Sequence, residues 1–435
     1  MISRYAWYLR EALKKVWLRV IGYAILAFLA AVLARVLSPY LPEALAFQTG
    51  SEAVSQLLGI LTSSMLAVTT FSLSIAVSAF TAAAGTATPR ATVLLQQDRT
   101  TQNVLATFLG AFLFGLIGLV ALHARFYSSS GKVVVFLFTI VVIALVVLAL
   151  IRWIGHLMKF GRMGDTLDRV ERAASGALLG RLENPFLGGR RLRDEIPARR
   201  TVIAAKATGY IQHVDMRALQ DCAESFKTEL FLHRLPGSFV APETPLLSAA
   251  SPALDDDQIA LLRKAFSTGT QRTFEDDPRF GLIVLTEIAS RALSPGVNDP
   301  GTAIDILGRH VRILSQWHER ADAEVRFDRI FVPPLDVQDA IEDAFRPIAR
   351  DGAALAEVQI RLQKALTALR NSLPDIFGPA CVAISREALD RAKAVPLLPA
   401  EMARLRDAAP VAQDAPSATR AQAKADPGPP QAGAA

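Results

Sequence analysis

The most constraining feature of this sequence is a run of nineteen residues without a single charge, Val133–Ile151, which reads VVVFLFTIVVIALVVLALI. As a helix rising about 1.5 Å per residue, this run is long enough to cross a hydrocarbon layer roughly 30 Å thick. The whole chain of 435 residues is 51% hydrophobic, with a mean hydropathy of +0.30. Such a composition predicts a membrane part joined to a soluble part.

Three further segments resemble spans, so four are predicted, near residues 18–37, 54–84, 103–124 and 133–155. The stretch Asn103–Leu122 is uncharged and contains Gly110, Gly115 and Gly118, where a neighbouring helix can approach closely. In the first span, the stretch Val20–Leu37 is interrupted only by Arg35, which lies near enough to its end to reach the interface. Residues 1–159 are therefore expected to form a membrane domain.

The second predicted span differs from the others because it is rich in hydroxyl groups. Its hydroxyl residues are Ser55, Thr62, Ser63, Ser64, Thr69, Thr70, Ser72, Ser74, Ser78 and Thr81. At 100° per residue, all of them except Ser64 and Ser72 fall within about half of the helix circumference. Two interpretations stay open: close helix packing with hydroxyls bonded to their own carbonyls, or a water-filled path. The residues predicted to line such a path are Ser63, Thr70, Ser74 and Ser78.

The distribution of Lys and Arg predicts the orientation of the spans. Basic residues are concentrated before the first span, between the second and third spans, and after the fourth, whereas the two other loops carry few. By the positive-inside rule, both termini are expected in the cytoplasm. A cleaved signal peptide is the competing interpretation, since Ala44-Leu45-Ala46 resembles a cleavage site, but Arg35 interrupts the apolar run.

Residues 160–405 have the composition of an α+β cytoplasmic domain. Short runs such as GYIQHVD and TELFLHRL, separated by turn residues, predict a small β module near residues 200–250. Apolar residues at helical spacing predict a helical part over residues 255–400. Residues 406–435 are rich in Ala and Pro and are expected to be disordered. The predicted fold class is thus an α-helical integral membrane protein with four transmembrane helices and an α+β C-terminal domain.

One loop of the helical part, RALSPGVNDPGTA at residues 291–303, combines helix-capping signals with nearby arginines. Asp277-Pro278 and Asp299-Pro300 predict the starts of helices 278–292 and 300–316, and Ser294-Pro295 repeats the pattern with a hydroxyl. A helix N-terminus at this loop could receive a phosphate or carboxylate. Alternatively, the acids cap the helices and pair with the arginines. The candidate ligand-loop residues are Arg272, Arg291, Ser294, Asn298 and Asp299.

The familiar enzyme signatures are missing from the sequence: it has no GxxxxGK[ST], GxGxxG, HExxH, CxxC or GxSxG. No catalytic residue and no cofactor is therefore predicted, and the protein is expected not to be an enzyme. The net charge of +6 arises from dispersed residues rather than from a basic run interleaved with aromatics, so no nucleic-acid partner is predicted.

No metal site is predicted either. His213, Asp215, Asp221 and Cys222 lie close in sequence, but strand and helix geometry should scatter them. The pair His310 and His318 lacks a third ligand and is expected to have packing or surface roles. Cys222 and Cys381 are the only cysteines, which gives neither a disulfide framework nor a zinc cluster.

Four stretches of the chain resemble a known family. They are TPRATVLLQQDRTTQNVLATFLGAFLF, GYIQHVDMRALQ, PGSFVAPETPLL and QRTFEDDPRFGLIVLTEIASRALSPGVNDPGTAIDIL. Together they resemble the bacterial predicted membrane proteins catalogued as domain of unknown function 2254, over about residues 5–400. The family's usual Gly-Asp before Phe-Val is Gly237-Ser238 here, so any role of that carboxylate would be absent. The resemblance implies several inner-membrane spans with a cytoplasmic C-terminal part, and no established reaction.

These features favour a non-enzymatic, oligomeric channel or transport-type protein. The hydroxyl-rich span would contribute to a path for an ion or small solute, and the cytoplasmic domain would assemble or gate it. The expected partners are the lipid bilayer, further copies of the chain, and an ion or small anionic ligand. The alternative is a membrane-anchored sensor or scaffold, in which the loop around Asn298 binds a ligand or a partner.

Overall fold

The computed structural model describes residues 16–37, 51–127, 130–192, 196–251, 253–318 and 324–410. The chain divides into two compact units, Ile2–Arg169 and Val170–Ala435. The basic N-terminal segment before residue 16, the Ala44-Leu45-Ala46 sequence and most of the tail predicted to be disordered lie outside the described residues.

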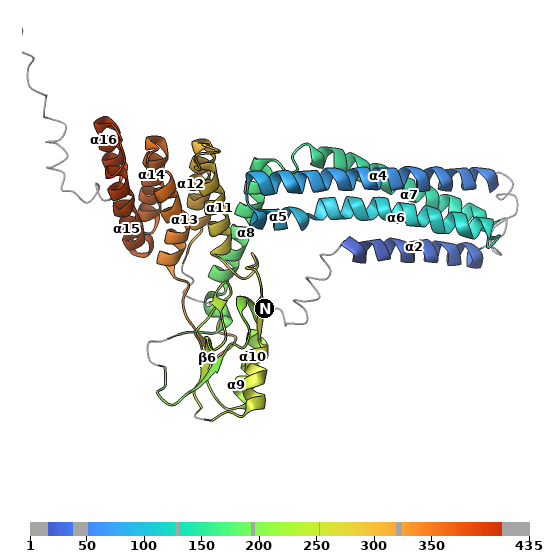
Figure 1. Ribbon diagram of the computed structural model, residues 1–435. Helices are drawn as coiled ribbons and strands as arrows, with labels where there is room; N and C mark the ends of the chain where they lie inside the picture. The colour runs from blue at the N-terminus through green and yellow to red at the C-terminus, as the bar shows by residue number, and fades with distance from the viewer. Residues whose placement is uncertain are drawn as a thin grey trace, which may run out of the picture. The chain divides into compact units, whose positions relative to one another are not determined.

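The first unit consists of helices (Figure 1). They are α2 (Val16–Leu37), α4 (Ser51–Thr86), α5 (Pro89–Gln96), α6 (Arg99–His123), α7 (Gly131–Leu157) and the start of α8 (Met163–Glu183). Among the described residues, three helical segments have the length and hydropathy of a membrane span: Glu52–Thr86, Arg99–His123 and Gly131–Leu157. The span predicted near residues 18–37 coincides with α2, a helix of 22 residues that is not among these three segments.

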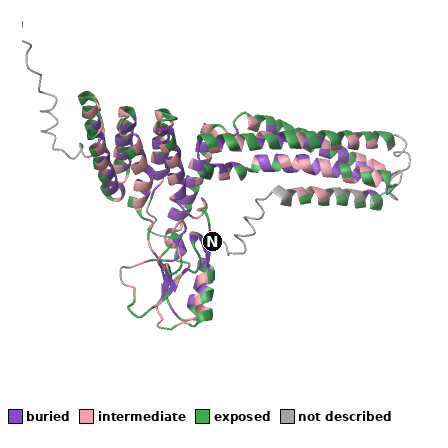
Figure 2. Cartoon of the chain, viewed as in Figure 1, coloured by how far each residue is buried: buried purple, intermediate pink, exposed green. Residues whose placement is uncertain are grey.

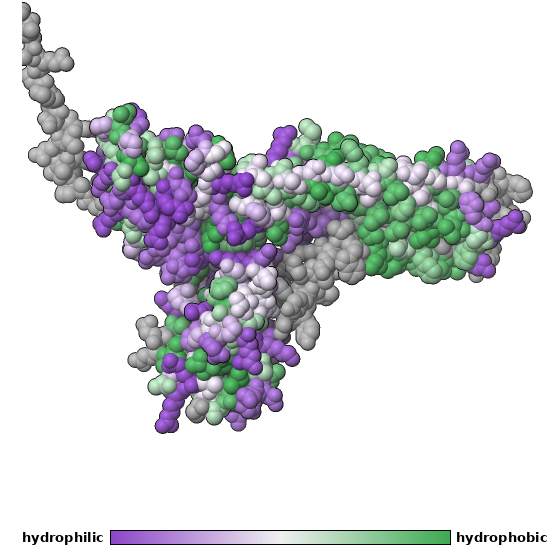
Figure 3. All heavy atoms as spheres, viewed as in Figure 1, coloured by the Kyte–Doolittle hydropathy of each residue, from purple (hydrophilic) through white to green (hydrophobic). Residues whose placement is uncertain are grey.

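Helix α6 lies at the centre of this unit, with α2, α4 and α7 packed against it. Their buried side chains form one apolar core that includes Leu58, Phe108 and Val142. The approach of α4 to α6 is close at Gly115, where a Cβ atom would lie 2.4 Å from Thr62 Oγ1 and 3.2 Å from the carbonyl oxygen of Leu58. The close helix contact predicted from the glycines is therefore present. Hydrophobic side chains cover much of the face of these helices that Figure 3 shows, as contact with membrane lipid requires.

The second unit contains two small sheets. Its strands are β1 (Arg190–Arg191), β2 (Thr201–Ala204), β3 (Gly209–Val214), β4 (Leu230–Leu232), β5 (Phe239–Val240), β6 (Pro245–Ala249), β7 (Phe266–Gly269) and β8 (Ile330–Val332). One sheet has the order β1-β8-β4-β6-β2 and the other β5-β3-β7. Strand β4 pairs antiparallel with β6, with Leu230 opposite Ala249, and parallel with β8, with Leu230 opposite Ile330.

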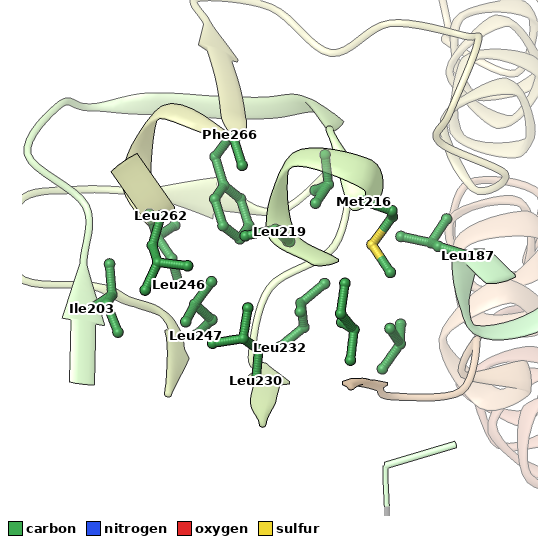
Figure 4. Packing of buried hydrophobic residues seen from close by; sticks show 14 of the residues in the cluster. Leu187, Ile203, Met216, Leu219, Leu230, Leu232, Leu246, Leu247, Leu262 and Phe266 are labelled. Atoms are coloured by element: carbon green, nitrogen blue, oxygen red, sulfur yellow. The ribbon is translucent and has the colours of Figure 1, made fainter. Parts of the chain in front are cut away.

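The β module is larger than predicted, because β1, β7 and β8 lie outside residues 200–250. The expectation of an entirely helical region over residues 255–400 was therefore wrong at β7 and β8. Both strands are short, and β8 is defined by pairing with the distant β4, a contact that local periodicity cannot reveal. Leucines from β4 and β6 and Phe266 from β7 pack with Met216 and Leu219 of α9 (Met216–Ser225), as Figure 4 shows.

The remaining helices of the second unit pack side by side with buried inner faces (Figure 2). Besides the short η2 (Pro185–Gly188) and α10 (Asp256–Lys264), they are α11 (Phe280–Ala292), α12 (Pro300–Leu314), α13 (Val337–Asp351), α14 (Ala356–Ser372), α15 (Pro374–Lys393) and α16 (Pro399–Ala408). Helix α13 packs on α11 and α15, and α14 packs on α12, α15 and α16. Helix α16 continues past residue 406, where disorder was predicted to begin.

Candidate functional site

The hydroxyl-rich helix predicted from the sequence is α4, and its hydroxyls bond to their own helix. Ser63 Oγ donates to the carbonyl oxygen of Gly59 at 3.0 Å, Thr70 Oγ1 to that of Leu66 at 3.1 Å, and Ser74 Oγ to that of Thr70 at 3.0 Å. Each donor is therefore satisfied without water or a neighbouring helix. This removes most of the cost of placing a hydroxyl in lipid, while the oxygen can still accept a hydrogen bond.

These groups lie on the outside of the helix bundle. Ser63, Thr70, Ser74 and Ser78 are all exposed, and we refer to these four residues as the hydroxyl face. In Figure 3 a pale band follows α4, bordered by strongly hydrophobic surface. The opposite side of α4 packs inward, and Ser72, which the helical projection placed off the polar side, is only 1% exposed. The described helices of one chain thus enclose no path along the hydroxyl face.

The predicted ligand loop is a capped helix junction. Asp299 accepts hydrogen bonds from Thr302 through the backbone N–H at 3.0 Å and the hydroxyl at 2.5 Å. These bonds lower the pKa of Asp299. Its own N–H donates to the carbonyl oxygen of Ala292 at 2.8 Å, which ties the loop to the end of α11. Asp299 therefore caps α12, as the sequence predicted.

One detail of this loop differs from the sequence prediction. Ser294 does not start a helix: its hydroxyl donates back to the carbonyl oxygen of Arg291 at 2.7 Å and so helps to end α11. Asn298 closes the turn with a positive φ of 48° and is exposed, like Arg291. A short polar side chain tolerates that backbone conformation better than most others do.

Arg272 does not belong to this loop. It binds Asp277 with two hydrogen bonds, Nε to Oδ2 at 2.7 Å and Nη2 to Oδ1 at 3.0 Å. Asp277 in turn accepts the N–H of Phe280 at 3.2 Å, at the start of α11. The loop lies at the other end of α11, which at about 1.5 Å per residue is roughly 18 Å away. The five candidate residues are therefore not brought together as one site.

The other arginines near the motif also pair with carboxylates. Arg309 binds Glu171 at 2.6 Å and Asp305 at 2.9 Å. Arg279 binds Asp343 at 2.6 Å and also pairs with Asp339. The arginines crowd this part of the sequence because they join α8, α11, α12 and α13. This arrangement favours the structural interpretation of the motif over an anion site.

A partly buried ionic cluster was not foreseen from the sequence. His213 of β3 donates from Nδ1 to Asp276 Oδ2 at 2.5 Å, although the two residues are 63 positions apart. Arg181 of α8 is only 7% exposed, and burial lowers its pKa to about 10 while the charge of Asp276 opposes that shift. Asp215, by contrast, caps α9 by accepting the N–H of Ala218. The proximity of His213 and Asp215 in sequence was thus uninformative, whereas the motifs GYIQHVD and QRTFEDDPRF meet in space.

Gly237 extends the same contact region. Its φ is +92°, and a Cβ atom there would lie 2.3 Å from a carboxylate oxygen of Asp277. The PGSFV stretch therefore packs against the FEDDP stretch, so three of the segments that carry the family resemblance converge. The joint presence of these three motifs in the sequence is the signal that points to their contact in the fold.

The cluster offers little access for chemistry. Ser267 of β7 is the cross-strand partner of His213, and the two side chains are 3% and 5% exposed. A serine, a histidine and an aspartate lie near one another here, but burial gives a substrate no route to the serine in this conformation. No group of three or more residues suited to hold a metal ion occurs among the described residues.

The two histidines around Trp317 have different surroundings. His310 is fully buried, and its Nε2 lies 3.0 Å from Thr286 Oγ1. The Thr286 hydroxyl donates to the carbonyl oxygen of Ala344, so it must accept from His310. Burial lowers the pKa of His310 to about 3. His318 is exposed. His310 thus has a packing role and His318 a surface position, in agreement with the sequence prediction.

A second ionic cluster lies in the first unit, where α6 begins and α7 ends. Asp98 caps α6 and accepts the N–H of Thr101 at 2.7 Å. Its carboxylate also lies 3.1 Å from His156 Nε2 and 2.6 Å from Arg169 Nη1. Burial raises the pKa of Asp98, but the hydrogen bonds from His156, Thr101 and Arg169 outweigh it and hold the pKa below its usual range. The cluster ties α6, α7 and α8 together at one end of the bundle.

Comparison with known proteins agrees with this architecture. The sequence model of the family described as "Predicted membrane protein", domain of unknown function 2254, matches residues 14–368. The chain belongs to this family. The three apolar helices and the convergent motifs of the second unit are all within the matched range, so domain of unknown function 2254 here combines a helical membrane part with a mixed α and β part.

Curated relatives add no activity. An uncharacterized protein of Mycobacterium tuberculosis and one of Mycobacterium bovis are each 29% identical to this chain over 191 residues. The match covers 42% of this chain and 36% of each relative, so the chain spans about a third of their length. No solved structure matches the chain.

Proposed function

We propose that this protein is an oligomeric, channel-like or transport-type membrane protein in which copies meet at the hydroxyl face of α4. Four spans per chain, α2, α4, α6 and α7, would cross a bacterial inner membrane with both termini in the cytoplasm. The part from residue 160 to 405 would assemble or gate the membrane part. The observation that carries the proposal is the hydroxyl face itself, which lies on the outside of an otherwise apolar helix.

The chemistry of this face suits a helix contact or a wet surface better than lipid. Small residues let helix backbones approach, and hydroxyl oxygens can accept hydrogen bonds from a second helix or from water. Because the donors already bond within α4, the face does not depend on a fixed partner. Since one chain does not enclose it, a path for an ion or small solute requires several copies around it.

The contact between copies can be tested in native membranes by disulfide cross-linking. Ser74→Cys on the hydroxyl face should form dimers through the new cysteine under mild oxidation. Leu73→Cys is the matched control, because Leu73 is also exposed but points about 100° away around the helix. The unmodified chain, with Cys222 and Cys381, gives the background. Equal cross-linking at both positions would show random collision and would contradict the proposal.

The path is tested by ion flux through liposomes that contain the full chain. Replacement of Ser63, Thr70 and Ser74 together by leucine should abolish the flux, because the wet surface becomes apolar. Replacement of the exposed Ile60, Leu66 and Leu73 by valine is the matched control and should preserve it. If cross-linking at Ser74→Cys succeeds but no flux appears under voltage, tension or osmotic load, the hydroxyl face is a packing interface only.

A further inference from the structure

A cavity of about 480 Å³ lies in the first unit among α2, α6 and α7, apart from the hydroxyl face. Figure 1 shows these three helices side by side. The wall from α6 is polar and consists of Thr100, Asn103 and Thr107, spaced three and four residues apart on one helical face. The wall from α7 contains Leu145 and Leu148. The volume is within the usual range for small-molecule sites, roughly 300–1,000 Å³.

One end of the cavity is cationic. Arg152 lines it from the last turns of α7. It follows Leu145 by seven residues, the same spacing that separates Thr100 from Thr107 on α6. Thr101 of α6 bonds to His156 of α7 at 3.1 Å, so the start of α6 and the end of α7 lie together. Arg152 is therefore near Thr100 and Asn103, whereas Leu145 and Thr107 lie deeper. The cavity thus has a charged, polar end and a more apolar end.

No carboxylate among the described residues forms an ion pair with Arg152. Asp98, which contacts His156 four residues after Arg152, has both oxygens engaged: Oδ1 with Thr101 and His156, and Oδ2 with Arg169. Arg169 is further held by Asp165 at 2.8 Å. Asp98 and Asp165 are thus engaged by Arg169 and His156, and Arg152 lines the cavity without a carboxylate partner among the described residues.

Helix α2 lines the other end of the cavity. Tyr23 lines the cavity, and its hydroxyl bonds to Thr107 Oγ1 at 2.9 Å. The Tyr23 ring lies against Gly110, where a Cβ atom would be 2.3 Å from it, so the ring has little freedom to fill the space. A ligand would meet amide and hydroxyl groups near Arg152 and aliphatic side chains beyond them.

We propose that this cavity binds one anionic glycerophospholipid of the surrounding membrane. Its phosphate would lie at Arg152 and accept hydrogen bonds from Asn103 and Thr100, and the first part of an acyl chain would lie along Leu145 and Leu148. A cationic pocket between membrane helices is a recognised setting for anionic lipid headgroups. Guanidinium also binds phosphate through paired, charge-assisted hydrogen bonds. The inference does not depend on a path along α4.

Native mass spectrometry of the detergent-solubilised full chain tests the proposal, with phosphatidylglycerol and phosphatidylcholine as the probes. We expect one phosphatidylglycerol to bind selectively and Arg152→Gln to weaken it about tenfold. Arg162→Gln is the matched control, since it removes an exposed arginine from the same segment outside the cavity lining and should change affinity less than about twofold. Equal binding of the two lipids, or equal loss in both variants, would overturn the proposal.

A second variant tests whether the lipid lies inside the cavity or on the outer surface of the helices. Ala149 lines the cavity and is 8% exposed, so Ala149→Phe should fill the space without changing its charge. Selective lipid binding should be lost, while the thermal midpoint of the variant reports whether the bundle still folds. Retention of the lipid by a folded variant would place it on the outer surface and refute the cavity site. Glycerol phosphate at millimolar concentration should not displace the lipid; if it does, the site binds free anions instead.

Discussion

Helix α4 of the first unit and the ionic clusters of the second unit satisfy their polar groups in opposite ways. In α4 the hydroxyls of Ser63 and Ser74 bond to carbonyls four residues earlier in the same helix. In the second unit, His213 bonds to Asp276 and Arg309 to Glu171, across 63 and 138 residues. A helix in lipid has no water to satisfy a donor, so local bonding is the safe solution. The folded second unit instead uses polar groups to fix which elements meet.

This difference predicts different responses to substitution. Polar groups that bond within one turn of their own helix can be removed with little effect on the fold. Any loss that follows their removal should therefore reflect a function of the surface. Groups bonded across elements should be costly to remove, because the partner stays buried and uncompensated. The following predictions test that contrast in order of decreasing effect.

The largest effect is expected from acid, through His310. Its pKa is about 3 in the folded protein and 6.5 when exposed. Between these two pH values the imidazole is protonated in the unfolded state and neutral in the folded state. The stabilisation is complete above pH 6.5 and is lost as the pH falls, by about 2 kcal/mol at pH 5 and about 4 kcal/mol near pH 3. Hydrogen exchange of α11 and α12 in the full chain, followed against pH, measures this loss.

Other carboxylates also contribute to acid sensitivity, so the control is His310→Gln. Glutamine can still donate to Thr286 but does not titrate. The slope of stability against pH between 6.5 and 4 should therefore be smaller in the variant. Parallel slopes for the two proteins would mean that His310 is not the group responsible.

The next effect concerns the partly buried cluster of the second unit. Asp276→Ala should destabilise that unit by about 2–3 kcal/mol, because Arg181 remains buried without its compensating charge. This value is below the cost of about 3–5 kcal/mol for breaking a fully buried ion pair, because the Asp276 side chain is 36% exposed. The measurement is chemical unfolding of the full chain in a mild detergent, with hydrogen exchange of β3 and α8 to locate the loss.

A double-mutant cycle shows whether the charge pair is the cause. Arg181→Met removes the buried cation, so Asp276→Ala added to it should cost at least about 1 kcal/mol less than in the wild-type background. Asp276→Asn keeps an acceptor for His213, so its stability should lie between that of the wild-type protein and that of Asp276→Ala. Additive costs would instead assign the loss to packing alone.

The same contrast explains what the sequence could and could not predict. The apolar spans, the cap at Asp299 and the tight contact at Gly115 follow from signals within a few residues. The strand β8 and the pair of His213 with Asp276 depend on partners far along the chain, which periodicity does not reveal. The outward direction of the hydroxyl face was also unpredictable, because a helical projection shows which residues share a side but not which side packs.

Helix packing within the membrane unit should give an intermediate effect. Gly110→Ala places a methyl group against the Tyr23 ring and should destabilise the α2 contact by about 1–3 kcal/mol. Gly59→Ala on α4 is the control, because nothing lies within 4 Å of its added Cβ. The thermal midpoint in detergent should fall for the first variant only. Tyr23→Ala should relieve the clash if the ring is its source.

The smallest effect is expected at the hydroxyl face. Ser74→Leu should change the stability of the detergent-solubilised monomer by less than about 0.5 kcal/mol, since Ser74 bonds only to its own helix and is exposed. Ser72→Leu, two residues earlier, should cost about 1–3 kcal/mol because that side chain is 1% exposed against the bundle. The two variants carry the same substitution on the same helix and differ only in the side that they alter. If Ser74→Leu leaves the monomer intact yet removes cross-linking between copies, α4 supports the fold with one face and the assembly with the other.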